Sequence, residues 1–221
     1  MPQFPSKLPF ASFLQYRPRS DDSVAVESQT VTYAIKQDKF ISIGGKPIRV
    51  IPYAAERIKV ALGEFPFLRK YFGPGIVLVP APRSSSIKPG ALWPALSICE
   101  ALVAVGLGDH VETCLERTKG VVKAATAKSG ERPGPQEHFD SISVRRQQSL
   151  QVPNALTIVD DVITRGATFL GVVPHLEAAF PGVPIRCFAL VRTMSYGEIL
   201  QLRDPVEGNI IYEHGSLRRE P

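Results

Sequence analysis

The chain has 221 residues and a formal net charge of +5, enough for one well-packed domain with additional elements but short for two full domains. The composition is that of a globular protein, and no apolar run approaches the roughly 20 residues that a membrane helix needs. The positive charge favours anionic partners, among which nucleotides, sugar phosphates and nucleic acid all qualify. The first ten residues lack the basic start and apolar core of a secretory signal, so we expect a cytoplasmic protein without a membrane partner.

The three cysteines, Cys99, Cys114 and Cys187, are widely separated and odd in number. They fit neither a disulfide framework nor a zinc site with Cys-x-x-Cys spacing. Each has apolar neighbours, so we interpret all three as small buried core residues.

The first 28 residues are expected to form an irregular N-terminal arm. Four prolines interrupt regular structure in this segment: Pro2, Pro5, Pro9 and Pro18. Interleaved aromatic residues argue against a purely solvated segment, so we expect the arm to pack on the domain or to bind a protein partner. A disordered tail is the alternative.

Residues 29–221 are expected to form one domain with its core at about 76–192. The spacing of apolar residues predicts helices at Glu27–Lys39, Ala54–Leu62, Ala91–Val105, Gly166–Phe180 and, in the tail, Tyr196–Leu202. Short apolar runs predict strands at Ile76–Val79, Val111–Leu115, Leu156–Val159, Ile185–Val191 and Asn209–Glu213. Strands that alternate with helices indicate an α/β fold, with an open parallel sheet flanked by helices and right-handed crossovers.

The most informative segment runs from Leu156 to Thr168, with the sequence LTIVDDVITRGAT. It begins as a buried strand and ends where a helix begins, and ligands in open α/β sheets bind just beyond the carboxyl ends of the strands. Asp160 and Asp161 are adjacent acids at that edge, where unpartnered charges are costly. Two vicinal sugar hydroxyls, and a nearby Mg²⁺ with its waters, would be suitable partners.

The residues after the two acids predict a phosphate-binding loop at a helix N-terminus. Gly166 lets the backbone approach an anion closely. The first N–H groups of the helix point outward, and the helix dipole adds partial positive charge there. Thr164 and Thr168 supply hydroxyl donors, and Arg165 adds charge. A ribose with a 5′-phosphate would span the two acids and this loop.

This stretch resembles the motif of type I phosphoribosyltransferases that binds phosphoribosyl pyrophosphate (PRPP): four mostly apolar residues, two acids, two apolar residues and a Thr/Ser-rich loop around a glycine. The resemblance implies the type I phosphoribosyltransferase fold with a small variable hood. It also implies an enzyme that uses Mg²⁺ and transfers the 5-phosphoribosyl group between PRPP and a nitrogenous base, releasing pyrophosphate.

The resemblance further assigns roles to residues. It makes Asp160 and Asp161 the catalytic pair that holds the ribose hydroxyls, without direct metal ligation and with Mg²⁺ reached through water. It places the 5′-phosphate on Val162, Thr164, Arg165, Gly166, Ala167 and Thr168. The hood that would bind the base is expected either from residues 30–70 or from the tail after Arg192.

Pyrophosphate binds, in that family, at a loop after an earlier strand. Here Arg83, Ser84 and Ser85 follow the strand predicted at Ile76–Val79, and a guanidinium with hydroxyl and N–H donors suits pyrophosphate. A Pro-rich turn with a solvated Arg83 is the alternative.

The polar segment from Arg117 to Gln148 lies where the family carries a mobile catalytic loop, and its excess of basic residues suits a lid over polyphosphate. A polar insertion without function is the alternative there.

The order of elements between Ile76 and Arg192 is similar to the ComF-type branch of the family, although the N-terminal four-cysteine zinc module of that branch is missing. Two functions therefore stay open: an enzyme, or a catalytically weak sensor or assembly subunit that binds PRPP or a nucleotide. Nucleic-acid binding has no zinc-finger, helix-turn-helix or RNP-type pattern to support it. A homo-oligomer is compatible with the sequence.

Overall fold

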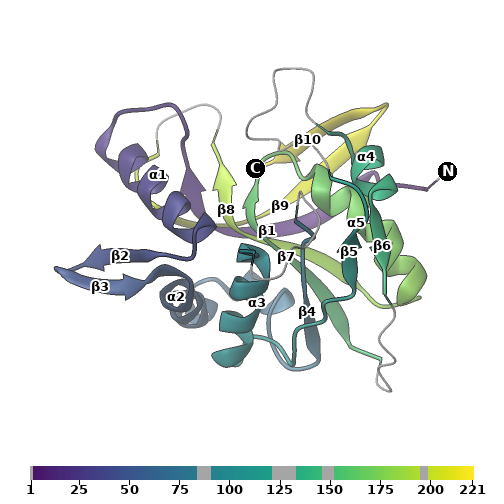
Figure 1. The fold of residues 1–221 in the computed structure, drawn as a ribbon, viewed down its shortest axis with the longest axis horizontal. Helices are drawn as coiled ribbons and strands as arrows, with labels where there is room; N and C mark the ends of the chain where they lie inside the picture. The colour runs from purple at the N-terminus through teal and green to yellow at the C-terminus, as the bar shows by residue number, and fades with distance from the viewer. Residues whose placement is uncertain (1, 84–90, 121–132, 146–151, 195–198) are drawn as a thin grey trace.

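The computed structural model describes residues 2–83, 91–120, 133–145, 152–194 and 199–221, which form three layers with a sheet in the middle (Figure 1). The sheet has six strands in the order β10-β9-β1-β8-β7-β4. Their bounds are β1 Lys7–Tyr16, β4 Ile76–Pro80, β7 Ala155–Ile163, β8 Ile185–Thr193, β9 Arg203–Glu213 and β10 Ser216–Glu220. Strands β1, β8, β7 and β4 are parallel, and β9 and β10 add an antiparallel hairpin at one edge. The expected α/β class with an open, mostly parallel sheet is confirmed.

Helices cover both faces of this sheet (Figure 1). One face carries α1 (Ser23–Lys36), α2 (Val50–Glu64) and α3 (Pro94–Ala104), and the other carries α4 (Pro135–Asp140) and α5 (Ala167–Ala179). A 3-10 helix, η1 (Pro66–Lys70), and two small hairpins complete the fold: β2 (Phe40–Ile43) with β3 (Lys46–Arg49), and β5 (Leu115–Arg117) with β6 (Ile142–Val144). None of the helices within the described ranges combines the length and apolar character needed to cross a membrane.

The two helical layers explain why the central strands β4 and β7 could be predicted from runs of apolar residues. In β4, Leu78 packs into the core on the α2–α3 side, whereas Val77 and Val79 pack into the core on the α5 side. A strand buried on both faces needs apolar residues at every position, and not only at alternate ones. The continuous apolar runs of β4 and β7 therefore predicted these strands correctly, with boundaries that differ by only a few residues.

The N-terminal segment requires a correction. The expectation of an irregular arm over residues 1–28 was wrong, because Lys7–Tyr16 form β1 between β8 and β9, and α1 already begins at Ser23. Pro9 is tolerated because the paired register with β8 starts only at Phe10, so its missing N–H breaks no bond on that side. The segment expected to bind a partner is thus an interior strand of the sheet.

Other differences lie at the edges of the fold. The strand predicted at Val111–Leu115 is reduced to a single bridge between Leu78 and Val111, and the hairpin strand β5 begins only at Leu115. Strand β10 was not predicted at all. Of the helix predicted at Tyr196–Leu202, residues 195–198 lie outside the described residues, and Ile199–Leu202 are not helical.

A buried ion pair fastens the start of β9 to the parallel strands. The side chain of Arg192, at the end of β8, is only 3% exposed and donates to both the carboxylate and the backbone oxygen of Asp204. The amide of Gln15 on β1 donates to the same carboxylate at 2.8 Å. A buried guanidinium without its partner is strongly unfavourable, so Asp204 connects three strands.

We therefore expect Asp204→Ala to destabilise the protein by about 3 kcal/mol, because it leaves the charge of Arg192 buried and unpaired. The free energy of unfolding in urea measures this effect. Glu64→Ala is the control, since it removes the partner of Arg203 in an exposed ion pair and should change stability little. Equal losses in the two variants would contradict the role assigned to Asp204.

Candidate functional site

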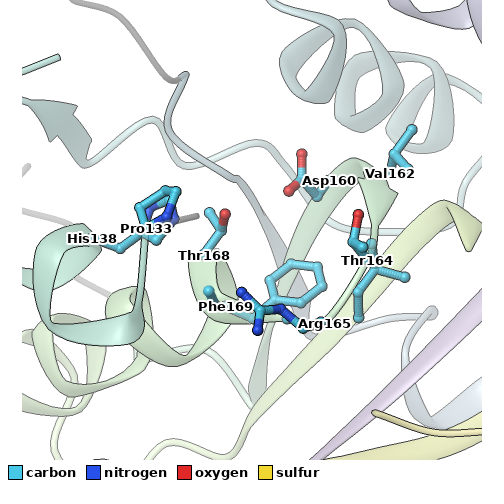
Figure 2. A pocket seen from close by; sticks show the side chains of 11 residues that line it. Pro133, His138, Asp160, Val162, Thr164, Arg165, Thr168 and Phe169 are labelled. Atoms are coloured by element: carbon cyan, nitrogen blue, oxygen red, sulfur yellow. The ribbon is translucent and has the colours of Figure 1, made fainter. Parts of the chain in front are cut away.

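A cavity lies at the carboxyl end of β7, where the chain turns into α5 (Figure 2). Its lining consists of Pro133, His138, Asp160, Val162, Ile163, Thr164, Arg165, Gly166, Ala167, Thr168 and Phe169. All six residues of the predicted phosphate-binding loop therefore border the same cavity, together with one of the two predicted acids. The position agrees with the rule that ligands of open α/β sheets bind beyond the carboxyl ends of the strands.

The turn into α5 depends on Gly166. Its φ angle is +92°, in the left-handed region, and a Cβ atom at this position would lie 2.6 Å from Cδ1 of Ile210 on β9. Gly166 is the N-cap residue of α5, and no side chain of the described residues caps this helix. The first N–H groups of α5 thus border the cavity without a side-chain acceptor, which is the arrangement that suits an anion.

The two acids differ in their relation to the cavity. Asp160 lines it, whereas Asp161 does not. The backbone N–H of Asp161 donates to Asp160 Oδ1 at 2.9 Å. Burial, and secondly the neighbouring carboxylate of Asp161, raise the pKa of Asp160 well above its ordinary value. A ligand that donates hydrogen bonds or brings a cation would relieve this unfavourable charge.

The acids also bear on the expected Mg²⁺. Among the described residues, no group of three or more His, Cys, Asp or Glu side chains is placed to hold a metal ion. Mg²⁺ commonly uses one or two carboxylates together with waters and substrate phosphates. The oxygen donors of Asp160 and Asp161 fit an ion held in this way, with the phosphorylated ligand supplying the remaining oxygens.

A buried arginine connects the segments around the cavity. Arg117 on β5 donates from Nε to the backbone oxygen of Arg83 at 2.7 Å and from Nη1 to Oγ of Ser141 at 2.5 Å. Its Nη2 lies 3.4 Å from Nδ1 of His138. Burial lowers the pKa of Arg117 to about 10, while the charge of Asp160 acts in the opposite direction. Arg117 therefore remains a cation at neutral pH and holds the segment after β4 beside α4.

Helix α4 brings His138 to the cavity. It packs directly on α5 at Gly171, where a Cβ atom would lie 2.5 Å from Cβ of His138 and 2.8 Å from the backbone oxygen of Pro135. The ring of Phe139 stacks on His175 of α5, with centroids 4.2 Å apart. Burial, and secondly the charge of Arg117, lower the pKa of His138 to about 4, so the imidazole is neutral at physiological pH.

The predicted pyrophosphate loop is only partly described. Arg83 is half-buried just beyond β4, and its Nη1 donates to the backbone oxygen of Ala91 at 3.2 Å. Ser84 and Ser85 lie outside the described residues. Arg83 does not line the cavity of the phosphate-binding loop, but it lies at the same sheet edge, because Pro80 of β4 pairs with Val159 of β7.

The expected basic lid also needs correction where it is described. Arg117 was placed in a flexible segment, yet it is buried in β5, and the same segment contains α4 and β6. The position of His138 at the cavity could not be predicted, since it is a single histidine in a polar stretch of the sequence. Only the close approach of α4 to Gly171, set by tertiary packing, brings it there.

No protein-family model matches this sequence, and no curated protein matches it either. The class of the protein, α/β with an open and mostly parallel sheet, follows from the structure alone. The functional assignment therefore depends on the geometry of the cavity and on the local resemblance of the segment from Leu156 to Thr168.

Gly166→Ala should destabilise the fold by about 2 kcal/mol, because the new Cβ meets Ile210 and the residue keeps a left-handed conformation. Chemical denaturation measures the loss. Gly182→Ala serves as a matched control, since Gly182 has a φ of +78° but no atom within 4 Å of an added Cβ. If both variants lose the same stability, backbone conformation alone explains the effect and the contact with Ile210 is unimportant.

A second expectation concerns pH. The pKa of His138 is lowered from its ordinary value of 6.5 to about 4 in the folded protein, so between these values the unfolded chain binds a proton that the folded chain does not. The contribution of His138 to stability is complete above pH 6.5 and decreases as the pH falls toward 4. Unfolding free energies of the wild type and of His138→Gln, measured from pH 4 to pH 8, should differ by a constant amount above pH 6.5, and the advantage of the wild type should shrink as the pH falls toward 4. A difference that stays constant over the whole range would contradict the buried neutral imidazole.

Proposed function

We propose that this protein binds PRPP with Mg²⁺ and transfers the 5-phosphoribosyl group to or from a nitrogenous base, as type I phosphoribosyltransferases do. One observation supports the proposal most strongly: Asp160 and the whole stretch from Val162 to Thr168 line a single cavity. A carboxylate at one end and helix N–H groups at the other match a ligand that carries vicinal hydroxyls near a phosphate.

The chemistry that this reaction needs agrees with the groups present. Cleavage of the bond at the anomeric carbon gives an oxocarbenium-like ribose and a departing diphosphate, so oriented charges matter more than a strong nucleophile. Asp160 would accept hydrogen bonds from the ribose hydroxyls and stabilise positive charge that develops on the sugar. The N–H groups at the start of α5 would hold the 5′-phosphate, and Arg83 would lie on the side of the diphosphate. Mg²⁺, when bound, would neutralise part of the diphosphate charge.

The alternative is a sensor or assembly subunit that binds PRPP or a nucleotide without turnover. One observation favours it: Asp161 does not border the cavity with Asp160, so only one carboxylate of the pair faces the bound ligand directly. An N-terminal arm that binds a protein partner would also have suited this alternative, but Lys7–Tyr16 of that segment form β1.

Calorimetry with PRPP and Mg²⁺, followed by a panel of purines, pyrimidines and orotate with detection of pyrophosphate, tests both functions. Binding with pyrophosphate release for one base supports the enzyme and names its substrate. Binding without release for any base supports the sensor. A protein that binds neither PRPP nor ribose 5-phosphate would overturn the proposal as a whole.

The double variant Asp160→Asn with Asp161→Asn should bind PRPP at least about tenfold more weakly, because hydrogen bonds to charged acceptors are replaced by weaker ones. Its melting temperature should equal or exceed that of the wild type, since the burial of a carboxylate charge and its repulsion by Asp161, which together raise the pKa of Asp160, are both removed. Glu213→Gln with Glu220→Gln is the control, because it removes two negative charges from an exposed ion-pair cluster around Arg218. Unchanged PRPP affinity in the first variant would exclude the acids from the site.

A further inference from the structure

Helix α4 is not part of the motif that suggested the function, yet it supplies one wall of the cavity (Figure 2). On α5, Gly171 lies one turn beyond Thr168, so both residues face the same side of the helix. The contact of His138 with Gly171 therefore places the imidazole beside the first turn of α5, where the loop from Thr164 to Thr168 borders the cavity. His138 is 7% exposed, so its ring is held within the protein and is not a mobile surface group.

The contact with Arg117 determines which ring nitrogen of His138 carries the proton. A guanidinium has only donors, so Nδ1, which lies 3.4 Å from Arg117 Nη2, can take part only as an unprotonated acceptor. In a neutral imidazole the proton is then on Nε2. Within the described parts of the chain, no hydrogen bond involves Nε2, and the ring borders the cavity.

Resting on the function proposed above, we propose that His138 is a specificity-determining ligand contact, whose neutral Nε2–H donates a hydrogen bond to a 5′-phosphate oxygen of the bound ribose phosphate. Arg117 is the positioning residue, since it fixes the tautomer from the opposite side of the ring. The phosphate is then held from two elements: by backbone N–H groups at the start of α5, and by a side chain from α4.

A neutral donor suits this location better than a charged one. The groups that face His138 are the cation Arg117 from β5 and the carboxylate Asp160 from β7, while Arg165 from the phosphate-binding loop is exposed. On α5, His175 interacts with Phe139 and not with His138, and on α4 Glu137 and Asp140 bond within their own segment. The nearest charge to the ring is therefore positive, which opposes protonation and leaves hydrogen bonding as the contribution of His138.

Two substitutions distinguish the role of Nδ1 from the role of Nε2 in the His138 ring. His138→Asn keeps an acceptor near the position of Nδ1 for Arg117 but removes the donor at Nε2, whereas His138→Gln places an amide N–H near the position of Nε2. Calorimetry with ribose 5-phosphate should show about tenfold weaker binding for His138→Asn and near wild-type binding for His138→Gln. Equal affinities in all three proteins, or equal losses in both variants, would overturn the role of Nε2.

The protonation state gives an independent measurement. In ¹⁵N-labelled protein, with the His138 resonances assigned from the His138→Gln spectrum, Nε2 should be protonated and Nδ1 unprotonated from pH 5.5 to pH 8. The Nε2 resonance should move when ribose 5-phosphate is added. A ring that titrates near its ordinary pKa, or that carries its proton on Nδ1, would overturn the inference.

Ligand binding by the wild-type protein distinguishes a failure of the role of His138 from a failure of the proposed function. Ribose 5-phosphate that binds the wild type and His138→Asn equally would overturn the role of His138 and leave the proposed function standing. A wild type that binds neither ribose 5-phosphate nor PRPP would overturn both. The affinities of the wild type and His138→Gln should keep a constant ratio between pH 5.5 and pH 8. A wild-type affinity that rises selectively below pH 6.5 would indicate a charged imidazole and contradict the proposal.

Discussion

The buried guanidinium of Arg117 is the interaction on which the architecture of the cavity depends. A desolvated cation must find acceptors, and here they come from two separate segments: Arg83 after β4, and His138 and Ser141 in and directly after α4. The hydrogen bonds of this one side chain therefore fix the distance between the edge of the sheet and α4, which packs on α5. The charge of Asp160, in β7, opposes the lowering of the pKa of Arg117 by burial.

The sheet supplies the rigid frame for this arrangement. Because β4, β7, β8 and β1 are parallel, their carboxyl ends meet at one edge, and each loop that leaves this edge starts near the same point. Strand β9 contributes Ile210, whose side chain lies so close to Gly166 that an added Cβ atom at this position would clash with it. The loop proposed to bind phosphate thus packs against Ile210 of β9, and the helix that follows it packs against α4, which limits the freedom of the loop before any ligand arrives.

The parts of the fold that the sequence predicted are those in which local pattern and burial agree. Strands β4 and β7 lie between two helical layers, so most of their residues are apolar and form runs that are easily recognised in the sequence. Strand β1 was missed because the prolines around it suggest irregular structure, whereas its burial depends on β8 and β9, which are distant in sequence. The position of the stretch from Val162 to Thr168, between the end of β7 and the start of α5, could be predicted because a strand, a glycine and a helix start follow one another directly. The position of His138 could not, since it depends on the absence of a side chain at Gly171.

The charge distribution around the cavity is the reason why we propose a phosphorylated sugar as its ligand in preference to a simple anion. Helix N–H groups and the neutral His138 favour a phosphate, but Asp160 at the other end repels one and has its own pKa raised by burial and by Asp161. A free phosphate ion would be attracted by the helix N–H groups and His138 but repelled by the carboxylate of Asp160. A ligand whose phosphate lies at one end and whose hydroxyls lie at the other satisfies both, because each hydroxyl donates to the carboxylate that an anion would avoid. With the proposed ligand, the opposed charges in the cavity would select for its length and polarity as well as for its phosphate.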